Sequence, residues 1–217
     1  MIKLYYSPGT ACLAPHFLLE ELGLAYELIL VDTSKQEHQQ AAYLALNPNG
    51  KIPLLIDGDF ALTESAAICL YLMDQYASTS ASPLLQASVG SLERARLYQW
   101  MLYLSNTLQA ELLTYFYPER LHDDAEVAAQ IKEKAAQRIG QMLSYIDQSL
   151  SNSDGDYLLG KQLSIADFFL FMLCRWTRGM QVPARNYPQL GQYLAKLIAC
   201  PAILNAFKQE GLEIPFY

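Results

Sequence analysis

The chain has 217 residues, of which 52% are hydrophobic and 17% are charged, so it can bury a sizeable core and is unlike a disordered chain. A net charge of −7 argues against a nucleic-acid or anionic-membrane partner. The start of the chain lacks the pattern of a signal peptide, and no apolar run reaches the ~18–20 residues of a membrane span, so we expect a cytoplasmic protein.

Residues 1–77 alternate strand and helix signals and predict an α/β domain. In chain order the signals are a strand at Ile2–Tyr6, a helix from Leu13 that ends at Gly23, a strand at Tyr26–Val31, a helix or loop at Ser34–Gln40, two strands around Asp57-Gly58, and a helix N-capped by Thr63. By the crossover rule, the first half should be a parallel unit to which the hairpin adds antiparallel strands.

Residues 78–88 read as a Ser- and Ala-rich linker, and 89–217 as an all-helical domain. Its expected helices are one long helix through Leu97–Leu112 that ends near Pro118, one through Val127–Leu150, one that follows Ser164, and two that open with prolines at Pro188–Ile198 and Pro201–Phe207. Asp167 lies three residues after Ser164 and predicts a capping box, so its role is structural.

The opening turn, between the first strand and the first helix, carries Cys12. Backbone N–H groups at a helix start are unpaired and partly positive, so a cysteine, serine or threonine there can hold or become an anion. The alternative is a plain connection with one buried thiol.

Two further features fit a peptide-like ligand. A proline before a strand, Pro53, must lie at an edge or turn, and a cis peptide there would turn the backbone of Ile52 outwards. The helix start at Ser65 would bind a carboxylate and Glu64 an ammonium group, unless this is only a helix cap. Together with the opening turn, these features would suit a γ-glutamyl tripeptide thiol.

At this point the chain resembles the cytosolic glutathione S-transferases, closest to the bacterial beta class. The resemblance covers essentially the whole chain and rests on four motifs: Tyr6-Ser7-Pro8-Gly9, Asn47-Pro48-Asn49-Gly50-Lys51-Ile52-Pro53, Leu62-Thr63-Glu64-Ser65 with Ala67-Ile68, and Leu159-Gly160 with Leu163-Ser164 and Ala166-Asp167. It implies a thioredoxin-like N-terminal domain, an all-α C-terminal domain and a homodimer.

The resemblance also implies a glutathione site. Pro53 would be cis, Ile52 would pair with the cysteinyl backbone of glutathione, and Glu64 and Ser65 would hold its γ-glutamyl end. The predicted glutathione site further includes Lys35, Asn106 and Gln109, all three assigned with the resemblance. Glutathione enters as a co-substrate, and no metal is expected because His16, His38 and His122 do not stand at ligand spacing.

Two positions depart from the beta-class pattern. Ala11 stands where that class has its cysteine, so Cys12 falls on the following serine, and Gln109 stands in place of its histidine. Other classes use a tyrosine at the end of the first strand or a hydroxyl in the turn. The catalytic candidates are therefore Cys12, Tyr6 and Thr10.

The expected activity is conjugation of the glutathione thiolate to small hydrophobic electrophiles, a detoxifying reaction. Tyr115, Phe116 and Trp176 are candidates for the electrophile pocket, or else plain core residues. The alternatives are a thiol-disulfide or peroxide activity, in which Cys12 forms a mixed disulfide with glutathione, and a non-catalytic glutathione-binding or interaction protein. The sequence does not name the electrophile.

Overall fold

The computed structural model describes residues 1–84, 86–215 and 217, which form two compact units. The first unit is Met1–Gln86 together with the stretch that begins at Ile198, and the second is Ala87–Leu197 together with Tyr217. The sequence assigned all of 89–217 to one helical domain. The structure groups the last helix with the first unit because that helix packs on the first helix of the chain.

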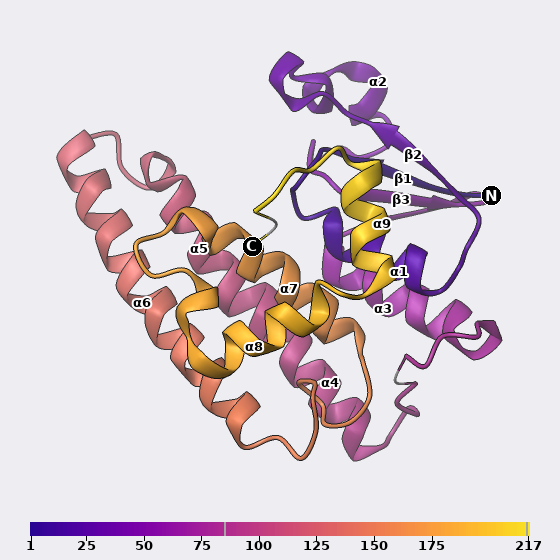
Figure 1. The fold of residues 1–217 in the computed structure, drawn as a ribbon. Helices are drawn as coiled ribbons and strands as arrows, with labels where there is room; N and C mark the ends of the chain where they lie inside the picture. The colour runs from indigo at the N-terminus through magenta and orange to yellow at the C-terminus, as the bar shows by residue number, and fades with distance from the viewer. Residues whose placement is uncertain (85, 216) are drawn as a thin grey trace. The chain divides into compact units, whose positions relative to one another are not determined.

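The first unit is a four-stranded sheet with helices (Figure 1). Its elements are β1 (Ile2–Tyr6), α1 (Leu13–Glu21), β2 (Tyr26–Leu30), the 3-10 turns η1 (Thr33–Lys35) and η2 (Glu37–Gln39), α2 (Ala41–Leu44), β3 (Leu54–Asp57), β4 (Phe60–Thr63), α3 (Ser65–Tyr76), the 3-10 turn η3 (Ala77–Thr79) and α9 (Pro201–Gln209). The strand order is β2-β1-β3-β4, with β1 parallel to β2 and the other pairs antiparallel. This confirms the predicted parallel unit with an added hairpin.

One predicted cap is wrong. Thr63 is the last residue of β4, and the residue that caps α3 is Glu64. The backbone of Glu64 has a φ of 69°, a left-handed conformation that a strand or helix residue does not adopt. The strand therefore continues through Thr63, and the helix begins at Ser65.

The core of the first unit lies on both faces of the sheet. Leu4 and Leu55 are paired across β1 and β3 and are fully buried. Successive side chains alternate between faces, so Tyr5 and Leu54 lie on the other face, where they pack with Tyr43. Figure 1 shows α2 on one side of the sheet and α1 and α3 on the other, with α9 beside α1.

The second unit is all-helical, as predicted. It consists of α4 (Leu92–Leu102), the π-helical stretch η4 (Tyr103–Leu108), α5 (Gln109–Phe116), the 3-10 turn η5 (Pro118–Arg120), α6 (Ala125–Ser151), α7 (Ile165–Trp176), the 3-10 turns η6 (Thr177–Gly179) and η7 (Ala184–Asn186), and α8 (Pro188–Leu197). The long helix expected before Pro118 is present, and the π-helical stretch in its middle has no signal in the apolar spacing.

The predicted capping box of α7 is present, and Asp167 is fully buried. Its carboxylate accepts hydrogen bonds from the Ser164 N–H (2.7 Å), the Ser164 hydroxyl (2.6 Å), the Leu158 N–H (2.9 Å) and the Tyr193 hydroxyl (2.7 Å). Burial raises the pKa of the Asp167 carboxyl, and the donated hydrogen bonds oppose that rise. The carboxylate therefore joins the start of α7 to the preceding loop and to α8.

Membrane-spanning helices and metal-binding clusters are two features that bear on the class of function. Within residues 1–84, 86–215 and 217, no helix by itself has the length and apolar character of a membrane span. In this described part of the chain, only α8 and α9, counted together as one bent pair, have a combined length and composition that would suit a span. In the same described residues, no group of three His, Cys, Asp or Glu side chains could hold a metal ion.

Candidate functional site

The strand register brings four loops to one edge of the sheet. Tyr5 pairs with Leu54, and Leu54 pairs with Thr63, so the end of β1, the start of β3 and the end of β4 are neighbours. Tyr6 pairs with Leu30, which adds the end of β2. The opening turn, the Pro53 loop, the β4–α3 junction and the η1 turn therefore meet there.

The opening turn is held by its own hydrogen bonds. The Thr10 hydroxyl donates to the Ser7 carbonyl at 2.7 Å, and the Ser7 and Thr33 hydroxyls are 3.4 Å apart. Gly9 has a φ of 71°, which a glycine adopts without the steric cost that a side chain would add. The proton of the Thr10 hydroxyl is thus already engaged within the turn.

Cys12 lies at the N-cap position of α1, but its thiol is inside the protein. The side chain has no exposed surface, and its Sγ is 3.1 Å from the Thr10 hydroxyl oxygen. Burial raises the pKa of the Cys12 thiol to about 12, so the neutral thiol is the favoured form near pH 7. Neither the burial nor the pKa supports Cys12 as a nucleophile or as a partner in a mixed disulfide.

Tyr6 closes β1 immediately before this turn and is half-buried. Burial, with a smaller effect of the Glu210 charge, raises the pKa of its phenol above the ordinary value, so the hydroxyl keeps its proton. Among the described residues, no group hydrogen-bonds to that hydroxyl. Of the three candidates, Tyr6 is the one with a proton free to donate to a ligand.

The Ile52–Pro53 peptide is cis, as the resemblance implied. The carbonyl of the preceding residue, Lys51, accepts hydrogen bonds from the Tyr43 hydroxyl (2.6 Å) and from the Asn47 amide (2.7 Å). Asn47 is 1% exposed, and its side-chain oxygen also accepts from the Asn49 N–H at 3.1 Å. These bonds fix the loop that presents the backbone of Ile52.

The β4–α3 junction presents an exposed carboxylate beside a helix start. Glu64 is exposed, and Ser65, the first residue of the twelve-residue α3, is 7% exposed. A non-glycine residue with positive φ costs of the order of 1–3 kcal/mol, a strain that concentrates at functional positions. The junction therefore offers an acidic group and a serine at a helix N-terminus, which suit an ammonium and a carboxylate.

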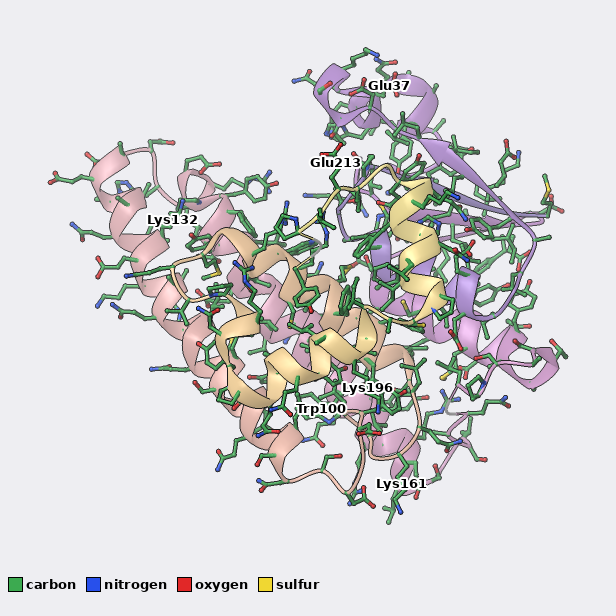
Figure 2. All side chains as sticks on the ribbon, viewed as in Figure 1. Glu37, Trp100, Lys132, Lys161, Lys196 and Glu213 are labelled. Atoms are coloured by element: carbon green, nitrogen blue, oxygen red, sulfur yellow. The ribbon has the colours of Figure 1, made fainter. Side chains whose placement is uncertain are left out.

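The η1 turn is organised by Asp32. Its carboxylate accepts from the Ser34 N–H and hydroxyl and pairs with the Lys35 ammonium at 2.9 Å, and these groups hold its pKa well below the usual range. The Asp32 N–H donates to Glu37 at 2.8 Å, and Figure 2 shows Glu37 on this part of the chain. Lys35 remains 73% exposed and available to an anion.

The remaining predicted site residues belong to the helical unit. Asn106 lies in the π-helical stretch and is exposed, and Gln109 is the first residue of α5. Tyr115 and Phe116 are stacked edge to face with centroids 5.3 Å apart, and the ammonium of Lys132, labelled on α6 in Figure 2, lies 4.8 Å from the Tyr115 ring centroid. Trp176 ends α7 and is half-buried.

Comparisons with known families decide the relationship. The family model for the glutathione S-transferase N-terminal domain matches residues 1–74, and the model for the glutathione S-transferase C-terminal domain matches residues 99–210. The chain belongs to the glutathione S-transferase family. Its fold is the glutathione S-transferase fold, with the thioredoxin-like and helical parts that the sequence predicted.

Relatives cover this glutathione S-transferase from end to end. Glutathione S-transferase GstA of Escherichia coli O157:H7 is 29% identical and covers 98% of this chain and 100% of that protein. A sphingomonad glutathione S-transferase complexed with glutathione is 31% identical with a TM-score of 0.83, and the beta-class enzyme of Sphingomonas chungbukensis is 31% identical with a TM-score of 0.79. Each match covers 97% of this chain and 100% of the solved one. The resemblance to the bacterial beta class is thereby confirmed.

Several residues that shape the candidate site of this glutathione S-transferase were missed in the sequence. Asn47 was named only as part of a motif, with no role of its own, although an Asn before Pro-Asn-Gly can bond to its own loop. Asp32 follows a strand and precedes Thr-Ser-Lys, a pattern that could have indicated the side-chain-capped turn. Glu210 had no signal, because its contact with the opening turn spans 201 positions.

A first prediction concerns Asn47. Asn47→Ala leaves the Asn49 N–H without its buried acceptor and removes one of the two donors to the Lys51 carbonyl. We expect a loss of roughly 1–3 kcal/mol in the free energy of unfolding, with weaker glutathione binding. Urea titration and calorimetry measure the two effects. Tyr43→Phe removes only the other donor to Lys51 and should cost less; equal losses would contradict the role given to Asn47.

Proposed function

We propose that this glutathione S-transferase conjugates the glutathione thiolate to small hydrophobic electrophiles. The observation that carries the proposal is the meeting of three features at one sheet edge. They are the cis Ile52–Pro53 peptide, the Glu64–Ser65 helix start, and the Tyr6 hydroxyl with its free proton. A relative that shares the fold was solved with glutathione, which supports the choice of ligand.

In the proposed complex each end of glutathione has a partner in the first unit. The Ile52 backbone pairs with the cysteinyl residue, and Ser65 with the amide groups of α3 receives the γ-glutamyl carboxylate. Glu64 receives the ammonium group, and Lys35 is available to a carboxylate. The assignments of Asn106 and Gln109 to glutathione, and of Tyr115, Phe116 and Trp176 to the electrophile, stay predictions.

The proposed chemistry is a displacement or addition at carbon. Glutathione loses its thiol proton to solvent, and the thiolate accepts a hydrogen bond from the Tyr6 phenol, which lowers the thiol pKa from its ordinary ~8.5. The sulfur electron pair forms the C–S bond. A leaving group departs with the electrons of its own bond, or an activated double bond takes them up. Tyr6 stays protonated throughout.

The alternative activity through a Cys12 mixed disulfide has less support. Attack by a thiol requires the thiolate and access to the sulfur, and Cys12 is buried with a raised pKa. Thr10 could donate to a ligand only by leaving the Ser7 carbonyl. In the other alternative, a non-catalytic protein would bind glutathione at the site described above but would not conjugate it.

We also propose a homodimer. Its support is a set of exposed apolar side chains on α4, where Leu92 is 77%, Tyr98 is 42% and Leu102 is 65% exposed. Light scattering coupled to gel filtration tests the mass directly, and a monomer at micromolar concentration would contradict it. The cytoplasmic location and the detoxifying role stay predictions.

A substitution at the helix start tests the proposed function. Ser65→Ala removes the hydroxyl assigned to the γ-glutamyl carboxylate, and a hydrogen bond to a charged group is worth ~1.5–3 kcal/mol, so glutathione binding should weaken by about tenfold or more. Calorimetric titration measures this. Ser91→Ala removes the serine that caps α4 and serves as the matched control with unchanged affinity. A wild-type protein that neither binds glutathione nor conjugates it to an aryl halide would refute the function.

A further inference from the structure

The end of the C-terminal helix is bonded to the opening turn through one carboxylate. Glu210, the residue that follows α9, accepts the Gly9 N–H at 2.8 Å through Oε2. Its other oxygen, Oε1, lies 2.8 Å from the Nδ1 of His16 on α1. The side chains of His16 and Glu210 have no exposed surface, so these bonds are made out of contact with water.

Both ring nitrogens of His16 have partners inside the first unit. Its Nδ1 faces a carboxylate, which can only accept, while its Nε2 faces the Tyr26 hydroxyl at 3.0 Å and the Gln209 side-chain oxygen at 3.2 Å. The Tyr26 hydroxyl itself donates to the Glu20 carboxylate. His16 therefore connects Glu210 on one side of its ring to Tyr26 and Gln209 on the other, and this network holds the Glu210 side chain in place.

The His16–Glu210 pair places a charged acceptor directly behind the turn that carries the thiolate-stabilising groups. Gly9 has positive φ, and one backbone bond ties it to a side chain that lies 201 positions away. The turn begins one residue after Tyr6 and ends at Cys12, and the Glu210 charge acts on both of these side chains. Moving Glu210 would therefore move the backbone on which the Tyr6 hydroxyl and the start of α1 depend.

We propose that Glu210 is a positioning residue for glutathione activation, which holds the opening turn through Gly9 while His16 holds Glu210. The inference rests on the proposed function, because it names the part of the chain that keeps that site in register. A purely structural role would need only a negative charge beside His16. A positioning role needs an acceptor that reaches Gly9.

Two variants separate the length of the Glu210 side chain from its negative charge. Glu210→Gln keeps the side-chain length and an oxygen for the Gly9 N–H but removes the negative charge. Glu210→Asp keeps the charge for His16 but is one methylene shorter, so its carboxylate retreats from Gly9. Glu213→Ala is the matched control, since Glu213 is an exposed acid on the same C-terminal stretch (Figure 2).

The measurements are kcat/KM for glutathione with an aryl halide, KM for the aryl halide, and hydrogen exchange of the Gly9 amide. We expect Glu210→Asp to lower kcat/KM for glutathione by about tenfold and to speed Gly9 exchange, with KM for the aryl halide unchanged. Glu210→Gln should stay within about threefold of wild type on both readouts. Glu213→Ala should match wild type.

The opposite order would overturn the inference. If Glu210→Gln lowers kcat/KM for glutathione and Glu210→Asp does not, then only the negative charge of Glu210 matters and its reach to Gly9 does not. Activity unchanged in both variants would overturn it as well. If Glu210→Gln does not fold, the charge is the essential property and the inference is also rejected. A wild-type protein that fails to bind glutathione refutes the proposed function instead, and Gly9 exchange then still reports whether Glu210 holds the turn.

Discussion

Asp167→Ala is expected to lower the free energy of unfolding by roughly 3–5 kcal/mol, because it strands the donors that the carboxylate satisfies. Those donors include the Leu158 N–H in the loop before α7, the Ser164 N–H at its start and the buried Tyr193 hydroxyl on α8. A chain of this size loses ~2–4 °C in melting temperature per kcal/mol. Differential scanning calorimetry and urea titration measure the change.

Ser164→Ala is the graded control for this experiment. It removes one hydroxyl donor from the Asp167 carboxylate and leaves the bonds from Leu158 and Tyr193 in place, so we expect a loss of ~1 kcal/mol. The structural role of Asp167 would be contradicted by an Asp167→Ala variant that unfolds at the wild-type urea concentration.

Tyr6→Phe is expected to slow conjugation by about 10- to 100-fold near pH 6.5, since it removes the hydrogen bond that stabilises the glutathione thiolate. The phenol is a donor because burial raises its pKa. Losing it raises the thiol pKa, so the thiolate form appears at higher pH. The rise in kcat/KM with pH should therefore move upward by about one to two pH units, and rates should converge in alkaline buffer.

Tyr5→Phe is the matched control for Tyr6. The two tyrosines are adjacent on β1 but point to opposite faces, and Tyr5 packs edge to face against Tyr43 with centroids 6.0 Å apart. Tyr5→Phe should therefore leave the pH dependence of kcat/KM unchanged. Cys12→Ala should likewise keep conjugation within about threefold, because a neutral buried thiol offers little to the reaction. An unshifted profile for Tyr6→Phe together with a lost activity for Cys12→Ala would reverse the assignment.

Local signals in the sequence were sufficient for most of the fold. The Asp57-Gly58 turn, the proline-opened helices and the Ser164–Asp167 capping box each depend on residues a few positions apart, and each appears in the structure. Thr63 failed as a cap because Glu64 takes a left-handed conformation that propensity alone does not predict. The π-helical stretch at Tyr103–Leu108 was not predicted, because the apolar spacing of an α-helix runs through it without interruption.

The candidate site was less accessible to sequence reasoning. Cys12 looked reactive because a helix start favours a thiolate, yet burial outweighs that effect and raises its pKa. Glu210 is the converse case, since an ordinary acid near the C-terminus reaches a turn near the N-terminus. Burial and long-range contacts are tertiary properties, and no spacing rule within one segment contains them.

The most direct test of the account is the pKa of the glutathione thiol when it is bound. Ultraviolet difference absorbance of the thiolate, followed from pH 5 to pH 9 at saturating protein, gives this pKa for the wild type, Tyr6→Phe and Cys12→Ala. We predict a value at least about one unit below the ordinary ~8.5 in the wild type and in Cys12→Ala, and a return toward ~8.5 in Tyr6→Phe. An unshifted pKa in the wild type, or an equal lowering in Tyr6→Phe, would contradict the assignment of Tyr6 as the group that activates glutathione.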